Sequence, residues 1–171
     1  MELFIVRHGE AVGEAPGLGD EGRFLTEKGR RVTRRVARFL AKKPGRRPAE
    51  IWTSPLVRAV QTAEILAEVS GVRAGVVAKA ELAPGRDPGD LLALLAAHAP
   101  SGPIALVGHE PSLSVLASSL LGKGFAGLRK SAVLALKWDG KEPAELRFLL
   151  DPKTLERHEH LDDVRRSDGS K

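Results

Sequence analysis

The sequence contains no cysteine and no tyrosine among its 171 residues. The absence of cysteine excludes disulfide bonds, cysteine-ligated metals and a thiol nucleophile. No apolar run approaches the roughly 18 residues that a membrane-spanning helix needs. The first residues, which include Glu2, have neither the basic nor the apolar region of a signal peptide. We therefore expect a cytoplasmic protein with no membrane partner.

Aromatic residues are scarce, at 4% of the chain, whereas the formal net charge is +5. A basic protein can attract nucleic acids or phosphorylated ligands. The arginines, however, gather on one face of a predicted helix and do not alternate with aromatic side chains that could stack on bases. We therefore expect no nucleic-acid partner. The arginine-rich face is expected to be solvated, with the docking of an acidic partner as the alternative.

The chain alternates between short apolar runs and segments of helical periodicity. Strands are predicted at 3–6, 50–53, 76–80, 104–108, 132–138 and 145–150, and helices at 26–43, 54–70, 88–98 and 111–121. Thr26 is the expected N-cap of the first helix, and Ser54 with Pro55 is expected to cap and open the second. This order predicts an α/β fold, a three-layer α/β/α sandwich with a mostly parallel sheet and an antiparallel edge element.

We expect a single domain over residues 1–150, which is long enough to bury a sizeable core. Residues 151–171 are polar and charged, and are predicted to form a loosely held tail. His158 and His160 form a His-x-His pair in this tail, but no further ligands accompany them. We therefore expect no metal there.

Cationic side chains follow the ends of the buried strands. Arg7 and His8 come directly after the first strand, His109 follows the strand at 104–108, and Arg58 lies in the first turn of a helix. Ligands of open α/β sheets bind beyond the carboxyl ends of the strands, so these four side chains should converge. Arginine binds phosphate oxygens through paired hydrogen bonds, and helix N-termini add backbone donors. The sequence therefore predicts a pocket for phosphate.

Histidine adds a group that is neutral near pH 7 and can attack phosphorus. The chain has no Gly-x-x-x-x-Gly-Lys-Ser/Thr loop of an NTPase, and no carboxylate cluster of a two-metal phosphatase. Each residue also has a plainer interpretation. His8 could be a buried structural histidine, and Arg58 an ordinary exposed helix arginine. The pairing of Arg7-His8-Gly9 with Gly108-His109 at two strand ends favours a catalytic pocket.

Three segments carry a resemblance to a known family. Arg7-His8-Gly9-Glu10 resembles the signature of the histidine phosphatase superfamily, the phosphoglycerate-mutase-like proteins. Segment 54–63, which contains Arg58, resembles the second motif of that family, and Val107–Pro111 resembles the third. The resemblance covers residues 1 to about 150. The short chain and segment 81–87 are most similar to the SixA branch, whose members are phosphohistidine phosphatases.

This resemblance implies a phosphoglycerate-mutase-like fold and a reaction without a metal or other cofactor. It implies that His8 is the nucleophile and becomes phosphorylated, while Arg7, Arg58 and His109 hold the phosphoryl oxygens. Gly9 is expected to lie in the same phosphate-binding turn. Glu81 is the position that best matches the general acid of the family, and Asp87 is the competing carboxylate in the same loop.

The substrate implied is phosphohistidine on a protein, for example a histidine phosphotransfer domain. The stretch between the second helix and His109 is short, which leaves little chain for a lid over a small metabolite. Two alternatives remain open at this point. One is a phosphatase of small phosphomonoesters from the same superfamily, and the other is a non-catalytic module that binds phosphoryl groups.

Overall fold

The computed structural model describes residues 1–42, 47–72, 74–98 and 102–161. The strands are β1 (Glu2–Arg7), β2 (Glu50–Thr53), β3 (Val76–Ala78), β4 (Ile104–Gly108), β5 (Val133–Lys137), β6 (Glu145–Leu150) and β7 (Arg157–His158). The helices are α1 (Glu27–Ala41), α2 (Val57–Ser70), α3 (Pro88–Ala97) and α4 (Ser112–Leu121), with a 3₁₀ helix at Ala80–Leu82.

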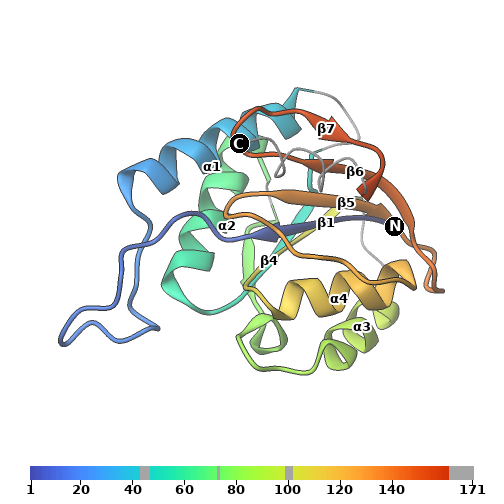
Figure 1. Cartoon of the computed structure of the whole chain (residues 1–171), viewed down its shortest axis with the longest axis horizontal. Coiled ribbons are helices and arrows are strands. Elements are labelled where there is room, and N and C mark those ends of the chain that lie inside the picture. Colours follow the sequence, from blue (N-terminus) through green and yellow to red (C-terminus); the bar gives the residue numbers. More distant parts are fainter. Residues whose placement is uncertain (43–46, 73, 99–101, 162–171) are drawn as a thin grey trace.

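The described strands form one sheet in the order β3-β2-β4-β1-β5-β6-β7 (Figure 1). Neighbouring strands from β3 to β1 are parallel. Strand β5 runs antiparallel to β1, and β6 and β7 continue the antiparallel pattern to the edge. The predicted α/β sheet with an antiparallel edge element is confirmed, and the sheet is mixed, because three of the described strand pairings are parallel and three are antiparallel.

Strand β1 is buried on both faces, as its unbroken apolar run predicted. Successive side chains of a strand point to opposite faces, so Leu3 and Ile5 lie in one core and Phe4 and Val6 in the other. Residues of α3 and α4 pack in the first core, and residues of α1 and α2 in the second. Figure 1 shows these helix pairs on opposite sides of the sheet. This arrangement is the predicted three-layer sandwich.

Helix α1 begins as the sequence predicted, because the Thr26 side chain accepts a hydrogen bond from the Gly29 N–H at 2.9 Å. Lys43, the predicted end of the helix, lies outside the described residues. Part of the arginine-rich face is paired within the chain. Arg34 forms an ion pair with Glu68 at 3.1 Å, and Arg35 donates to two backbone carbonyls at 152–153. These contacts join α1 to α2 and to the segment after β6.

Helix α2 begins at Val57, so the prediction that Ser54 caps it was wrong. The Ser54 N–H donates to the Val107 carbonyl at 2.9 Å, which keeps Ser54 extended beside β4. Strand β3 is also shorter than predicted. It ends at Ala78, and the chain turns into the 3₁₀ helix two residues later.

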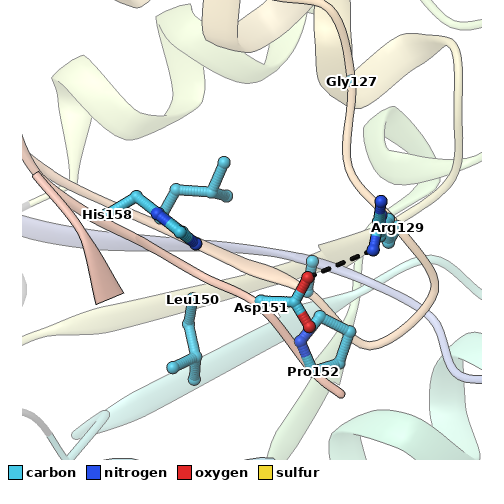
Figure 2. A pocket seen from close by; sticks show the side chains of 8 residues that line it. Gly127, Arg129, Leu150, Asp151, Pro152 and His158 are labelled. Carbon is cyan, nitrogen blue, oxygen red and sulfur yellow. Dashed lines mark hydrogen bonds and ion pairs between the residues drawn. The ribbon is translucent and has the colours of Figure 1, made fainter. Parts of the chain in front are cut away.

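The prediction of a loosely held tail from Asp151 was wrong for the described residues 151–161. Strand β7 pairs with β6, and Pro152 is buried. Figure 2 shows Asp151 facing Arg129, with which it forms an ion pair at 3.2 Å. The sequence missed β7 because a strand of two residues has no recognisable alternation. Residues 162–171 lie outside the described residues, and the domain boundary at residue 150 stays a prediction.

None of the helices within the described ranges has the length and apolar character needed to cross a membrane. Within the same ranges, no three histidine, aspartate or glutamate side chains are grouped so that they could hold a metal ion.

Candidate active site

His8 and His109 lie side by side just beyond the C-terminal ends of the central strands β1 and β4. The register of the parallel pair β1 and β4 places Arg7 opposite Gly108, so the two histidines follow neighbouring strand ends. The His8 N–H donates to the Gly108 carbonyl at 3.1 Å, and the ring centroids are 4.9 Å apart. Two residues separated by about a hundred positions are thereby brought together, as predicted.

The His8 ring is held in one orientation. Its Nδ1 lies 2.7 Å from the Gly9 carbonyl oxygen. Because a carbonyl can only accept, Nδ1 carries the proton and Nε2 carries a lone pair. Burial, helped by the nearby guanidinium groups of Arg58 and Arg7, lowers the pKa of His8 to about 4. The imidazole is therefore neutral at pH 7, with its Nε2 able to act as a nucleophile.

His109 is also buried and neutral. Its Nε2 lies 2.8 Å from the Ser54 hydroxyl oxygen. Burial, together with repulsion from His8 when that ring is protonated and from the Arg58 guanidinium, lowers the pKa of His109 to about 3. Its other nitrogen, Nδ1, is buried and has no hydrogen-bond partner in the described structure.

The two low histidine pKa values predict a loss of stability in mild acid. The unfolded chain binds protons at these histidines below about pH 6.5, whereas the folded chain does so only near pH 4 at His8 and near pH 3 at His109. The free energy of unfolding should therefore fall as the pH falls from 6.5 to 4, by roughly 3 kcal/mol for His8 alone. Urea unfolding at several pH values measures this slope. An equally steep slope in His8→Ala would contradict the assignment.

Arg7 and Arg58 are each anchored by part of the guanidinium group. Arg7 donates from Nη1 to the Leu128 carbonyl at 2.7 Å. Arg58 donates to the Asp20 carbonyl at 2.6 Å and to the Asp20 carboxylate at 3.0 Å. The same contact with Arg58 lowers the pKa of Asp20. The Nε atoms of both arginines are buried and have no partner among the described residues.

Buried polar atoms without a partner are rare in proteins, because each one costs free energy. In the described part of the chain, five such side-chain atoms occur. Three of them are Arg7 Nε, Arg58 Nε and His109 Nδ1, which belong to the residues predicted to hold phosphoryl oxygens. These nitrogens, together with the guanidinium charges of the buried Arg58 and the half-buried Arg7, suit an anion that has several acceptor oxygens.

Gly9 supports His8 instead of offering a donor to phosphate. Its N–H donates to Thr62 Oγ1 at 3.0 Å, and its carbonyl accepts from His8. Thr62 in turn donates to the Arg58 carbonyl at 2.7 Å. The expected phosphate contact of Gly9 is therefore not favoured by this structure, in which its N–H is already bonded. Close packing explains the glycine, since a Cβ there would lie 2.7 Å from Thr33 Oγ1.

The variant Gly9→Ala should therefore be destabilised by about 1–3 kcal/mol, because the added methyl group overpacks the turn that holds His8. Urea unfolding measures the change. Gly13→Ala is the matched control, since a Cβ at Gly13 meets no atom within 4 Å. Equal stabilities for the two variants would contradict the close approach at Gly9.

Glu110 connects the turn after β4 to the loop before β5. Its carboxylate accepts from the Leu128 N–H at 2.8 Å, and from the Ser114 N–H and hydroxyl in the first turn of α4. The Leu128 carbonyl is the group that anchors Arg7. The loop then returns to the site, where the Ser131 N–H contacts the carbonyls of Arg7 and His8. Figure 2 shows the adjoining pocket, where Arg129 of this loop faces Asp151.

Glu81 and Asp87 are placed differently. Glu81 is half-buried and lines a small pocket together with Ser112, at the start of α4. It makes no hydrogen bond to Arg7, His8, Arg58 or His109, all of which are described. Asp87 is exposed, and its carboxylate caps α3 by accepting from the Gly89 N–H at 2.8 Å. Capping leaves Glu81 as the better placed of the two carboxylates.

The sequence prediction missed several residues that build this site. Thr62 lies in the motif around Arg58, one helical turn later, and this spacing was the available signal. Glu110 directly follows His109, but its partner Leu128 is remote in the sequence. Asp20 lies in a glycine-rich loop, where no local pattern points to its contact with Arg58.

Comparison with known proteins places this geometry in a family. The model of the histidine phosphatase superfamily (branch 1) matches residues 3–83. An uncharacterized protein of Picosynechococcus sp. is 38% identical over 169 residues, which cover 91% of this chain and 99% of that protein.

Solved structures agree with this assignment. The protein histidine phosphatase SixA, solved with tungstate, is 26% identical and superimposes with a TM-score of 0.80 over 91% of this chain and 100% of its own. A mycobacterial glucosyl-3-phosphoglycerate phosphatase is 21% identical, with a TM-score of 0.62 over 92% of this chain and 95% of its own, and so shares the fold. The chain therefore belongs to the histidine phosphatase superfamily, as a SixA-like phosphatase.

Proposed function

We propose that the protein dephosphorylates phosphohistidine on a protein, through a phosphorylated His8 intermediate. The observation that carries this proposal is the set of buried, unpartnered nitrogens of Arg7, Arg58 and His109 around a histidine with a free Nε2 lone pair. The oxygens of a phosphoryl group can accept hydrogen bonds from these three nitrogens. Its electrophilic phosphorus can be attacked by the fourth nitrogen, His8 Nε2.

The reaction has two steps that exchange bonds at phosphorus. In the first, His8 Nε2 forms a bond to phosphorus while the bond to the substrate nitrogen breaks, and that nitrogen takes up a proton. In the second, water attacks phosphorus, the bond to His8 breaks, and inorganic phosphate leaves with the oxygen of the water. The substrate histidine and free His8 are then regenerated.

Arg7 and Arg58 stabilise the charge that the transferring oxygens carry in both transition states. Each guanidinium is already fixed by backbone carbonyls, so little reorganisation is needed at the moment of reaction. The low pKa of His8 keeps its lone pair available at neutral pH. A protonated His8 could not attack.

Glu81 is the proposed general acid, which would give a proton to the leaving group and accept one from water. Its half-buried position beside the start of α4 supports this role, as does the use of Asp87 as a helix cap. General acid catalysis contributes about 10²–10⁴-fold in rate. An imidazole leaving group needs less of this help than a sugar hydroxyl.

Two observations support a protein substrate over a small phosphoester. One is the similarity to a protein histidine phosphatase at 26% identity. The other is the short connection between α2 and β4, which holds only β3, the 3₁₀ helix and α3 among its described residues. A connection of this length leaves little chain for a lid, so we expect a side chain on the surface of another protein to reach the site. A cytoplasmic location, where such partners occur, stays a prediction.

Parallel assays test the proposal, using a phosphorylated histidine phosphotransfer domain and a panel of sugar and glycerate phosphates. The expected result is faster hydrolysis of the phosphoprotein by the wild type and no hydrolysis by His8→Ala. A preference for a small ester would contradict the proposed protein substrate, but it would remain consistent with the proposed mechanism through His8. Binding without turnover on every substrate would indicate a non-catalytic phosphoryl-binding module.

A further inference from the structure

Ser54 is buried in the site although its predicted role as a helix cap was wrong. Its side chain is fully buried, and its N–H donates to the Val107 carbonyl beside the end of β4. Its hydroxyl oxygen lies 2.8 Å from His109 Nε2 and 3.3 Å from the Leu56 nitrogen. These are the hydroxyl's two hydrogen-bond partners among the described residues.

The two contacts decide where the hydroxyl proton goes. The Leu56 N–H can only donate, so the Ser54 oxygen accepts there. If His109 Nε2 also donated, the Ser54 proton would be buried without an acceptor, which costs free energy. If the hydroxyl donates to Nε2 instead, every group in the contact is satisfied. His109 then carries its own proton on Nδ1.

We infer that Ser54 is a positioning residue that fixes the proton of His109 on Nδ1, so that this nitrogen donates a hydrogen bond to a phosphoryl oxygen. Nδ1 is the buried nitrogen of His109 that has no partner among the described residues. With the other tautomer it would present a lone pair, which repels an anionic oxygen. The inference rests on the proposed function for the identity of the ligand, but not for the tautomer itself.

The same tautomer then serves opposite purposes in the two histidines. His8 donates from Nδ1 to the Gly9 carbonyl, which leaves the Nε2 lone pair for attack. His109 accepts at Nε2 from Ser54, which leaves the Nδ1 proton for binding. Burial lowers the pKa of both rings well below 7, so each neutral ring carries one proton on one of its two nitrogens. The hydrogen bonds with Gly9 and Ser54 therefore determine that His8 presents a lone pair to the ligand and that His109 presents an N–H donor.

Nitrogen-15 NMR of the histidine rings tests this inference, because the coupling pattern of each ring identifies its protonated nitrogen. At pH 7, the wild type should show His109 protonated on Nδ1. In Ser54→Ala, His109 should shift partly or wholly to Nε2–H, and the Kd for inorganic phosphate should rise roughly tenfold or more. Ser54→Thr keeps the hydroxyl and should retain the wild-type tautomer.

Ser70→Ala is the matched control, since it removes another buried serine hydroxyl, at the far end of α2. It should leave the His109 pattern and phosphate affinity unchanged. A wild-type His109 protonated on Nε2 would overturn the inference, even if Ser54→Ala failed to fold. An unchanged tautomer in folded Ser54→Ala would also overturn it. A wild type with the predicted tautomer that binds no phosphate would instead contradict the proposed function.

Discussion

Replacement of His8 by alanine is expected to lower kcat/KM by roughly 10⁴- to 10⁶-fold, the loss typical of removing a covalent nucleophile. No other side chain in the described site offers a comparable group. The Nε2 of His109 is taken up by Ser54, and the arginines are not nucleophiles. The loss should appear in the step that transfers the phosphoryl group, with little change in substrate binding.

His160→Ala is the control for this variant, because His160 is an exposed histidine in the segment after β7. It should keep wild-type activity. Steady-state kinetics on the preferred substrate, with circular dichroism to verify folding, measures both variants. Activity of folded His8→Ala within tenfold of wild type would exclude His8 as the nucleophile.

Replacement of Arg58 by alanine should have the second largest effect, a loss of about 10²- to 10³-fold in kcat. Arg58 is 5% exposed, and its guanidinium is one of the two whose charge acts on His8. In the proposed mechanism its charge faces the same substrate oxygens in both steps, so both steps should slow. Arg58→Lys should restore only part of the rate, because a lysine cannot both bond to Asp20 and present a second fixed donor.

Arg58→Ala also releases Asp20, so the loss of the loop contact must be separated from the loss of charge. Arg23→Ala serves this purpose, since Arg23 binds the other carboxylate oxygen of Asp20 at 3.0 Å from outside the buried site. It should lower kcat only slightly. Steady-state kinetics measures kcat for both variants. If Arg58→Ala and Arg23→Ala lost kcat equally, the loss would come from displacement of the loop that contains Asp20 and not from the missing charge of Arg58.

The sequence was sufficient where a residue follows directly from a strand or a motif. Buried strands can be recognised from their unbroken apolar runs, and parallel strands end at the same edge of the sheet. This reasoning brought His8 and His109 together, and the structure places their rings 4.9 Å apart. Arg58 was found because its position follows from the helix that comes after β2.

Local patterns failed where a side chain bonds to a distant segment. Ser54 before Pro55 has the pattern of a helix cap, but its hydroxyl is bonded to His109, which follows the neighbouring strand β4 and is remote in the sequence. Asp20 and Leu128 lie in loops, and each anchors an arginine that is remote in sequence. These contacts depend on the fold as a whole, so no window of neighbouring residues contains the information.

The hydrogen bonds in this site share one arrangement. Three of the predicted phosphate-binding residues, Arg7, Arg58 and His109, are held by the protein through some of their polar atoms, and each retains one buried nitrogen without a partner among the described residues. The folded protein therefore carries an energetic cost that an anion would offset on binding. Inorganic phosphate should accordingly raise the thermal stability of the wild type.

The most direct test of the account is to trap the phosphorylated enzyme. The wild type is mixed with phosphorylated substrate, quenched in alkali, which preserves phosphohistidine, and examined by mass spectrometry of its peptides. The account predicts one phosphoryl group per chain, attached to His8 and missing in His8→Ala. Turnover without any phosphorylated enzyme, or a phosphoryl group attached to His109 or another residue, would contradict it.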